Sequence, residues 1–430
     1  MVLGEKFVVQ GGYPLAGRVV PAGNKNAALP ILAACLLTDQ EIVLRNVPVI
    51  RDVENMLAIL SDLGVGVRWS GDHELTVRAL NVRKAALDPG LCRQIRASIL
   101  LAGPMLARCG DIELPPPGGD VIGRRRVDTH LLALRALGAD IRVGRGYRMK
   151  AKGHLRAAEI LLDETSVTAT ENAMMAAALA KGTTVIHNAA SEPHVQDLAH
   201  FLNSLGAKIS GAGTSSLVIQ GVEKLSGGSH EVVVDHTEIA SFIALAAVTG
   251  STITIANTVP EHLRMILLAF RRLGIKAEVH GNDIFVPRHE RLKIVSDAHG
   301  AIPKIDDAPW PGFPTDLISI AIVVATQAQG TILIFEKMFE GRMFFVDKLI
   351  AMGARIVLCD PYRVVVVGPS RLRGEIMESP DIRAGMALLI ASLCAEGTSV
   401  IGNIGQIDRG YERIEERLQA LGAHIERVKE

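Results

Sequence analysis

Charged side chains recur at the starts of apolar segments along this chain of 430 residues. Lys25 and Asn26 precede the run ALPILAACLL, Arg96 precedes ASILLAG, and Arg383 precedes AGMALLIASL. Backbone N–H groups at a helix start face an anion, so several such starts together would form an anion-binding site. An acidic residue there is explained as a cap, whereas a cation is locally unfavourable. We therefore interpret Lys25, Arg96 and Arg383 as ligands of a negatively charged substrate rather than as solvated surface charge.

A second candidate is the segment LPPPGGDVIGRRRVD at residues 114–128, which combines a rigid proline run, a glycine pair and three arginines. Alone, this pattern is more typical of a solvated connector. Beside the helix starts, it predicts a lid that brings Asp120 and Arg125 to a bound anion. The chain has no HExxH or CxxC spacing and no Walker or GxGxxG loop after a strand. We therefore predict no metal site, and any nucleotide must be bound by another geometry.

The elements that position these residues are predicted by an internal repeat. Six phrases of the type LSDLG follow helical patterns about 70 residues apart, and they end at Gly64, Gly138, Gly206, Gly274, Gly353 and Gly422. Each unit reads as βαβαββ, with a first helix that has no polar stripe and a second that is amphipathic. In residues 166–180 we expect a helix capped by Thr170 and ended by Lys181 and Gly182. A solenoid is the alternative, but its repeats usually run about 20–50 residues, so three units per closed domain fit better.

Composition excludes several classes of function. The 46 basic and 46 acidic residues cancel, so no overall field favours nucleic acid or anionic membranes. No apolar run approaches the roughly 18 residues that a membrane helix needs. The five cysteines form no CxxC pair, which fits a reducing cytoplasm, and 48% apolar residues can fill sizeable cores.

The motifs together resemble a known family, the UDP-N-acetylglucosamine 1-carboxyvinyltransferases, which are the enolpyruvyl transferases of peptidoglycan synthesis. The resemblance covers essentially the whole chain and lies in GNKNAALPILAACLL, RQIRASI, PGGDVIGRRRVDTH, SVTATENA, FPTDL, GRMFFV, SPDIRAG and IDRGYERIEERLQALGAHIE. The Lys25–Asn26 pair separates this family from its sister, which acts on shikimate 3-phosphate and has Lys-Ser there. The resemblance implies an α/β fold, a two-domain inside-out α/β barrel of six βαβαββ repeats, three per domain. It implies a first domain at residues 23–232, carrying the mobile loop, and a second at 1–22 plus 233–430, with the active site in the cleft between them.

The reaction that the resemblance implies adds the sugar 3-hydroxyl to C2 of phosphoenolpyruvate and expels phosphate, without metal or redox cofactor. It would serve cell wall biogenesis, and with it cell shape and division, in the cytoplasm, on small-molecule substrates without nucleic acid, membrane or protein partner. Phosphoenolpyruvate would be bound by Lys25, Arg125, Arg342, Arg383 and Arg409. The catalytic residues would be Asp316 as base and Asp120 as general acid, with Lys25 and Arg409.

Most members of the family carry cysteine at the position of Asp120, and fosfomycin inactivates them by alkylating it. A carboxylate is a much poorer nucleophile than a thiolate, so we expect insensitivity to fosfomycin. A carboxyl can act as general acid only if burial lifts its pKa above about 3.9.

For the nucleotide, the resemblance implies Asn26, Arg96 and Asp316 at the sugar, Asp128 and Thr129 at uracil, and Ser166, Val167 and Thr168 at the diphosphate, with Met338 as a further contact. Three further residues, besides Asp120, depart from the family pattern: Arg126, where proline is usual, Glu164, where some members have lysine, and His236, at an often basic position. These departures leave two alternatives open. One is an enolpyruvyl transferase for another uridine nucleotide in secondary metabolism, and the other is a catalytically silent paralogue.

Overall fold

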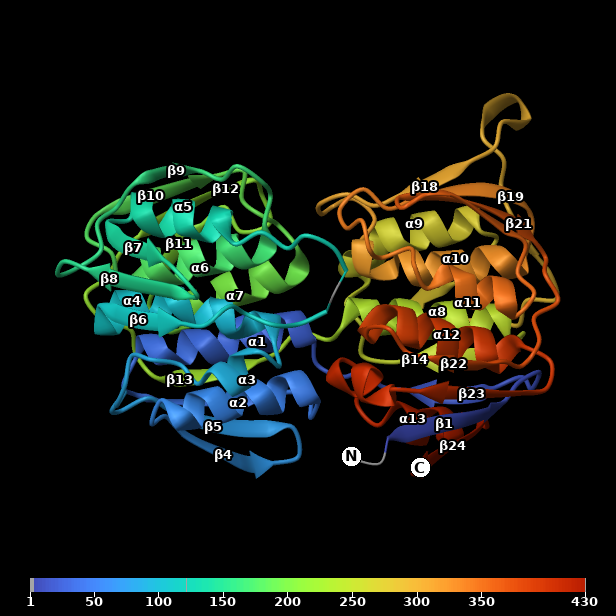
Figure 1. Cartoon of the computed structure of the whole chain (residues 1–430), viewed down its shortest axis with the longest axis horizontal. Coiled ribbons are helices and arrows are strands. Elements are labelled where there is room, and N and C mark those ends of the chain that lie inside the picture. Colours follow the sequence, from blue (N-terminus) through green and yellow to red (C-terminus); the bar gives the residue numbers. More distant parts are fainter. Residues whose placement is uncertain (1–3, 121, 430) are drawn as a thin grey trace. The chain divides into compact units, whose positions relative to one another are not determined.

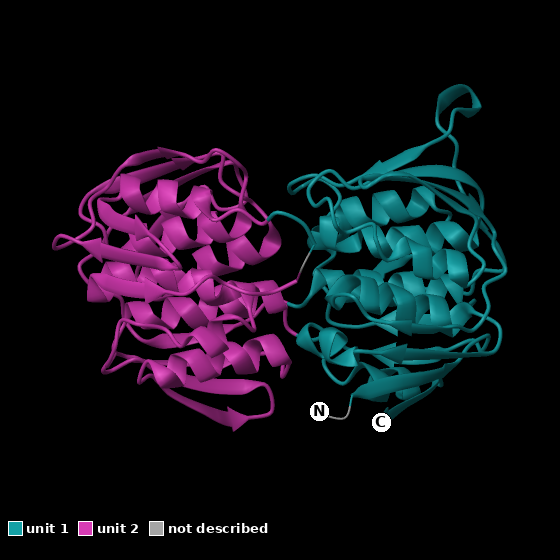
Figure 2. Cartoon of the chain, viewed as in Figure 1, with its two compact units in different colours: residues 1–22, 121–124, 234–430 teal, residues 23–120, 125–233 magenta. Residues whose placement is uncertain are grey.

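The computed structural model describes residues 4–120 and 122–429 of the chain. They form two compact units, each with its own hydrophobic core (Figure 2). Unit 2 comprises residues 23–120 and 125–233, and unit 1 comprises residues 1–22, 121–124 and 234–430. None of the described helices combines the length and apolar character needed to cross a membrane.

Unit 2 contains three sheets among its described residues (Figure 1). In spatial order they are β13(Gly228–Glu231)-β3(Glu41–Arg45)-β5(Glu74–Arg78)-β4(Gly66–Gly71), then β6(Asp111–Leu114)-β8(Tyr147–Ala151)-β7(Ala139–Val143), and β11(Lys208–Ser210)-β12(Ser216–Gln220)-β10(Thr183–His187)-β9(Glu159–Leu161). β13 pairs parallel to β3, and β9 pairs parallel to β10, while the other pairs are antiparallel.

In the part that the structure describes, unit 1 repeats this arrangement with three further sheets. They are β22(Ile376–Glu378)-β23(Thr398–Gly402)-β1(Glu5–Gln10)-β24(His424–Lys429), then β15(Glu278–His280)-β16(Asp283–Val286)-β14(Thr252–Ile255)-β2(Ala16–Val19), and β17(Leu292–Lys293)-β19(Ala328–Phe335)-β21(Arg363–Gly368)-β20(Ile356–Asp360), with β18(Lys304–Asp306) also on β19. The two N-terminal strands thus lie in sheets made with strands from the C-terminal half of the chain.

The apolar helices are buried inside each unit, as their lack of a polar stripe predicts (Figure 1). They are α1(Lys25–Ala34), α4(Ala102–Cys109) and α6(Val167–Ala178) in unit 2, and α8(His236–Val248), α10(Ile318–Gln327) and α12(Ile382–Cys394) in unit 1. The helices that precede the repeated glycines are α2(Arg51–Asp62), α5(Asp128–Ala136), α7(Pro193–Ser204), α9(Arg264–Arg272), α11(Val346–Ala351) and α13(Ile414–Ala420). Short helical segments complete the fold: α3(Pro89–Cys92), η1(Cys35–Leu37), η2(Arg96–Leu101), η3(Pro260–Leu263), η4(Ala298–Gly300), η5(Thr315–Leu317) and η6(Ile404–Arg409).

The repeated glycines end these helices in a left-handed conformation. Gly64, Gly138, Gly206, Gly274, Gly353 and Gly422 have φ between 89° and 104°. After Gly64, the N–H of Val65 bonds back to the carbonyl of Leu60 at 3.0 Å, and Ala207 and Ala423 make the equivalent bond. This Schellman geometry favours glycine because a residue with Cβ is strained at positive φ, so the repeated phrases mark the ends of helices.

An asparagine in the left-handed region follows the central strand in four of the repeats, which the sequence analysis did not single out. Asn46, Asn188, Asn257 and Asn403 have φ of 52–58°. The side-chain amides of Asn46, Asn188 and Asn403 donate to the carbonyls that follow the parallel edge strands β13, β9 and β22, at 2.8–3.0 Å. All four asparagines therefore turn the chain after the strand, and Asn46, Asn188 and Asn403 also tie two strands together.

Two local predictions are wrong. Ser166, not Thr170, caps α6, because its hydroxyl accepts the N–H of Ala169, whereas the Thr170 hydroxyl donates to the Ser166 carbonyl inside the first turn. Residues 96–101 form a 3₁₀ segment rather than an α-helix. Nearby, the Ser98 hydroxyl donates to the carbonyl of Ile95 at 3.1 Å, a local bond that competes with α-helical pairing.

Candidate active site

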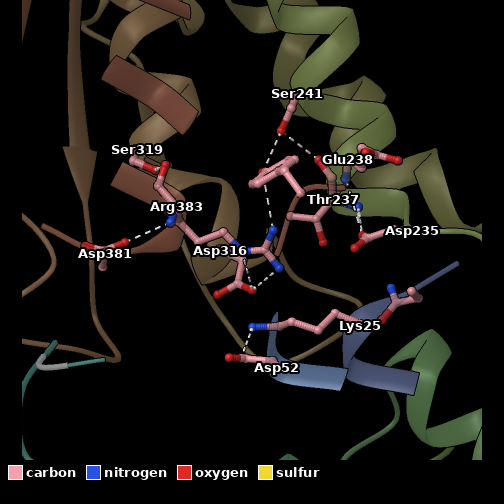
Figure 3. A network of polar contacts seen from close by, with 12 residues as sticks. Lys25, Asp52, Asp235, Thr237, Glu238, Ser241, Asp316, Ser319, Asp381 and Arg383 are labelled. Carbon is pink, nitrogen blue, oxygen red and sulfur yellow. Dashed lines mark hydrogen bonds and ion pairs between the residues drawn. The ribbon is translucent and has the colours of Figure 1, made fainter. Parts of the chain in front are cut away.

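In unit 2, Lys25 is the first residue of α1, and it is only 9% exposed. A buried cation at a helix N-terminus needs a counter-charge, and the carboxylate of Asp52 lies 3.3 Å from the ammonium (Figure 3). Asp52 stands in the first turn of α2, where its charge is favourable. Asn24 caps α1 by accepting the N–H of Ala27, and Asn26 is partly exposed beside Lys25. Asp52 lies in no recognisable motif and was therefore not predicted from the sequence as a partner of Lys25.

The glycine pair before Asp120 is explained by close packing. The N–H of Gly118 bonds to the carbonyl of Cys92 at 3.0 Å, and a Cβ on Gly118 would lie 1.8 Å from the carbonyl oxygen of Arg93. Gly119 has φ +100°, and a Cβ there would lie 2.7 Å from Cβ of Arg96. The segment that carries Asp120 is therefore seated directly against the start of η2. The side chain of Asp120 is partly exposed.

Arg96 holds the returning limb of the same loop. Its guanidinium donates to the backbone carbonyl of Arg125 at 2.6 Å and to that of Arg126 at 3.1 Å. Burial and the nearby charge of Arg125 lower the pKa of Arg96 to about 10. In this structure Arg96 therefore positions the loop, and the sugar contact expected from the resemblance stays a prediction.

The tip of the loop packs within unit 1. Val121 lies outside the described residues, but the carbonyl of Ile122 accepts the N–H of Gly341 at 2.9 Å, and the N–H of Arg124 donates to Glu340 Oε1 at 2.8 Å. That hydrogen bond lowers the pKa of Glu340. The tip is thus fixed by the segment that leads into Arg342.

Arg126 organises the start of α5. It pairs with Asp128 at 3.3 Å and with Asp163 at 3.1 Å, and the hydroxyl of Thr129 donates to Asp163 at 2.6 Å. The hydrogen bond from Thr129, together with the charge of Arg126, lowers the pKa of Asp163. Arg126 therefore neutralises the acids around the two residues expected at uracil, while Glu164 is exposed.

A buried histidine orients Thr168. Nδ1 of His130 lies 2.9 Å from the amide nitrogen of Asn172, and Nε2 lies 3.0 Å from the hydroxyl of Thr168. Burial and the charge of Arg96 lower the pKa of His130 to about 3, so the ring is neutral. Since the amide nitrogen can only donate, Nδ1 accepts, Nε2–H donates to Thr168, and the Thr168 hydroxyl keeps its own hydrogen for another acceptor. Ser166, Val167 and Thr168 thus present donors at the N-terminus of α6.

In unit 1, Asp316 bridges two buried arginines, Arg342 and Arg383, and its contact with Arg383 is drawn in Figure 3. Its carboxylate accepts Arg342 Nη2 at 3.0 Å, and Arg383 Nε and Nη2 at 3.0 and 2.9 Å. The arginine side chains are 5% exposed and that of Asp316 is 25% exposed. Although burial alone would lower the pKa of Arg383, the carboxylate of Asp316 and the contact with Tyr411 raise it above its ordinary value.

Arg383 is the second residue of α12, so it is a cation in the first turn of a buried helix, as Lys25 is in α1. Asp381 caps the helix by accepting the N–H groups of Arg383 and Ala384 at 2.8 and 2.9 Å. The hydroxyl of Tyr411 lies 3.3 Å from Arg383 Nη1, and it also contacts the hydroxyl of Ser241. Asp381 thus fixes the backbone of Arg383, while Asp316 and Tyr411 fix the direction of its guanidinium.

Arg409 lies at the end of η6, and its guanidinium donates to Gln406 at 2.9 Å. The preceding residue, Asp408, accepts two bonds from Arg427 of β24 at 2.7 and 3.0 Å, so η6 is anchored to the sheet. His236 at the start of α8 is buried against Trp310, and burial lowers its pKa to about 4, so it adds no charge near neutral pH. Met338 is 36% exposed in the turn that follows β19.

The expected residues therefore fall into two sets. Unit 2 carries Lys25, Asn26, Arg96, Asp120, Arg125, Asp128, Thr129, Ser166, Val167 and Thr168, and unit 1 carries Asp316, Met338, Arg342, Arg383 and Arg409. Within the described residues, no three histidine, cysteine or acidic side chains are placed to hold a metal ion. Burial raises the pKa of the Cys92 thiol to about 11 and that of Cys394 to about 12, which leaves both unreactive.

The family model described as EPSP synthase (3-phosphoshikimate 1-carboxyvinyltransferase) matches residues 9–418. The chain is 58% identical to the UDP-N-acetylglucosamine 1-carboxyvinyltransferase of Bradyrhizobium diazoefficiens, over 99% of this chain and 98% of that one. It is 52% identical to the protein of the same name from Treponema denticola, over 98% and 99% of the two chains.

Solved structures share the fold. The enolpyruvyl transferase NikO from Streptomyces tendae matches with a TM-score of 0.87 at 23% identity over 100% of both chains. EPSP synthase from Acinetobacter baumannii matches with a TM-score of 0.76 at 18% identity over 99% of this chain and 100% of that one. The predicted two-domain inside-out α/β barrel is confirmed. The chain therefore belongs to the UDP-N-acetylglucosamine 1-carboxyvinyltransferases, within the EPSP synthase family.

Proposed function

We propose that this enzyme transfers the enolpyruvyl group of phosphoenolpyruvate to the 3-hydroxyl of UDP-N-acetylglucosamine and releases phosphate, the first committed step of peptidoglycan precursor synthesis. The observation that carries the proposal is Asp316, a carboxylate held between Arg342 and Arg383 in a family member that is 58% identical to a protein named for this reaction. The proposal places the enzyme in the cytoplasm and requires no cofactor and no protein partner.

The charge of the substrate explains the cations. Phosphoenolpyruvate carries about three negative charges, and their desolvation must be offset by positive groups fixed before the substrate binds. Arg342 and Arg383 are buried, and Tyr411 and Asp316 already orient the guanidinium of Arg383. Lys25, Arg125 and Arg409 would supply the remaining charge.

Asp316 is suited to act as the general base. Its side chain is 25% exposed, and its two oxygens are held by different arginines, Oδ1 by Arg342 and Oδ2 by Arg383. When the anionic substrate takes over these arginines, the carboxylate loses their stabilisation and becomes more basic. It can then accept the proton of the sugar 3-hydroxyl as the oxygen attacks C2.

Asp120 would deliver the proton to the methylene carbon. It directly follows the glycines that seat the loop against residues 92–96, so its backbone is well placed although its side chain is partly exposed. To protonate the methylene carbon, Asp120 must itself carry a proton. Closure of the site around the substrate would bury the Asp120 carboxyl, and burial favours the protonated form.

The nucleotide would be bound at the starts of α5 and α6. The N-terminus of α6 with Ser166, Val167 and Thr168 suits the diphosphate, and the neutral His130 leaves the Thr168 hydroxyl free to donate to it. Asp128 and Thr129 would contact uracil, Asn26 and Arg96 the sugar, and Met338 would line the same substrate.

Phosphate release tests the proposal. Phosphoenolpyruvate is incubated with UDP-N-acetylglucosamine, UMP or UDP-glucose, each with and without fosfomycin. Release with the acetylated sugar alone, unaffected by fosfomycin, is the expected result. Release only with another acceptor would move the enzyme to the alternative of secondary metabolism and would make Arg126 and Glu164 the residues to explain. No release with any acceptor would favour the silent paralogue.

A further inference from the structure

Two buried carboxyl groups bind the segments that carry Asp316 and Arg342, and no step of the proposed reaction uses them. Asp307 and Glu336 are both 0% exposed. β18 and β19 run parallel, and Asp306 is in register with Phe335. Asp307 directly follows β18 and Glu336 directly follows β19, so the strand pairing places their side chains beside each other.

The two carboxyls fix the turn that follows β19. Glu336 accepts the N–H groups of Met338 and Phe339 at 3.0 and 2.9 Å, and the hydroxyl of Thr315 lies 3.1 and 2.9 Å from its two oxygens. Asp307 Oδ1 accepts the N–H of Lys337 at 2.5 Å. The turn leads directly to Arg342, and Thr315 directly precedes Asp316. Both residues of the proposed reaction are therefore anchored on this pair.

Arg342 has a donor that is not used. Its Nη2 binds Asp316, but its Nε is buried and makes no hydrogen bond among the described residues. That Nε lies 3.7 Å from Oε2 of Glu336. A small movement of the guanidinium would close this gap and would draw Arg342 away from Asp316.

The charge of Glu336 decides which carboxyl holds Arg342. Two carboxylates in contact in a dry site cannot both be ionised at low cost. Burial and the hydrogen bond with Asp307 raise the pKa of Glu336 to about 8, although Arg342 opposes this shift. The charged groups that face Glu336 are Asp307 from the end of β18 and Arg342 from the turn, and Asp316 from η5 acts through Arg342.

We propose that Asp307 and Glu336 share one proton and act as positioning residues, which keep Arg342 directed at Asp316 and phosphoenolpyruvate while Glu336 is neutral. When Glu336 loses the proton, its carboxylate pairs with Arg342 Nε and withdraws the guanidinium from the substrate. This inference rests on the proposed function, because it assigns phosphoenolpyruvate to Arg342.

Two nearly isosteric variants separate this role from a purely structural one. Glu336→Gln imitates the protonated state, because its amide can donate to Asp307 while its oxygen still accepts from the turn. Asp307→Asn removes the neighbouring charge and offers Glu336 a donor, so Glu336 should be ionised at pH 7. Asp306→Asn is the matched control, because Asp306 is adjacent but pairs with Lys304 and Lys337 at the surface.

The experiment measures kcat and KM for phosphoenolpyruvate from pH 6 to 9.5. In the wild type and in Asp306→Asn, KM should rise above about pH 8, by up to tenfold per pH unit. Glu336→Gln should keep a low KM throughout that range. Asp307→Asn should already raise KM about tenfold at pH 7 with a smaller change in kcat, and the double variant should restore it. Equal shifts in both single variants, or an unchanged alkaline rise in Glu336→Gln, would overturn the inference.

Calorimetric binding of inorganic phosphate keeps the test independent of turnover. At pH 7, Glu336→Gln should bind phosphate as the wild type does, and Asp307→Asn should bind it more weakly. If the wild type releases no phosphate with any acceptor but this order of affinities is found, the proposed function fails while the positioning pair stands. If turnover is normal and both variants bind phosphate equally, the positioning pair fails alone.

Discussion

Replacing Asp316 by asparagine keeps the shape of the side chain between Arg342 and Arg383 but removes its charge. As the proposed general base, Asp316 should matter most for turnover, and loss of such a group typically lowers kcat by about 10²–10⁴-fold. The same change leaves two guanidiniums, each 5% exposed, without their shared counter-charge. Turnover and anion binding should therefore respond in opposite directions.

The effect on stability follows from burial. Breaking a fully buried ion pair by removing one partner costs about 3–5 kcal/mol. Because the Asp316 side chain is 25% exposed and the asparagine oxygen still accepts a hydrogen bond, we expect about 1–3 kcal/mol. In a unit of roughly 200 residues this corresponds to a fall in Tm of about 2–12 °C.

Anion binding should be kept or strengthened. In the wild type, phosphoenolpyruvate must displace the Asp316 carboxylate from Arg342 and Arg383. Without that carboxylate the displacement costs nothing, so the Kd for phosphoenolpyruvate or inorganic phosphate should fall by up to about tenfold. Added phosphate should then raise the Tm of the variant more than that of the wild type.

The assays are phosphate release for kcat, calorimetry for anion binding and thermal melting for Tm. Asp347→Asn is the control, because that carboxylate has a side chain that is 75% exposed and lies 3.7 Å from Lys348, and it should change stability by less than about 0.5 kcal/mol. A kcat within about threefold of the wild type would refute the role of Asp316 as base. Weaker phosphate binding in Asp316→Asn would refute the assignment of the arginines to the anion.

Three further predictions concern other parts of the protein. Fosfomycin should not inactivate the wild type, whereas Asp120→Cys should be alkylated with time, since a thiolate is the better nucleophile; mass-spectrometric labelling of Asp120 itself would contradict this. Gly118→Ala should lower kcat at least about 10²-fold, because its Cβ would lie 1.8 Å from the Arg93 carbonyl oxygen and displace the Asp120 segment. The control is Gly206→Ala, where φ is +103° and a Cβ would have no atom within 4 Å. It should lower the free energy of unfolding by only about 1–2 kcal/mol and leave kcat unchanged. Burial lowers the pKa of His130 to about 3 and that of His236 to about 4, so below about pH 6.5 the unfolded chain binds protons that the folded chain does not. The free energy of unfolding should therefore be highest above that pH, and each histidine should lower it by about 2 kcal/mol by pH 5. Equal denaturation midpoints at pH 7 and pH 5 would contradict the burial of these rings.

Local features were readable from the sequence because their physical causes are local. A glycine directly after an amphipathic helix commonly ends it with positive φ, and the six glycines do so between 89° and 104°. An apolar helix without a polar stripe must be buried, and α8, α10 and α12 are. The cap of α6 was misplaced by four residues, because Ser166 and Thr170 are both good capping residues and only the backbone conformation distinguishes them.

The tertiary structure alone decided how the site is held together. Asp316 meets Arg342 across 26 residues of sequence and Arg383 across 67. Asp307 meets Glu336 because β18 and β19 pair in one register, and a shift of one residue would turn the side chains to opposite faces. By itself the sequence determined the repeat, the buried helices and the residue types able to bind an anion, since periodicity and charge are properties of short segments. Which charges become partners depends on strand register and helix packing between distant segments, and no short segment carries that information.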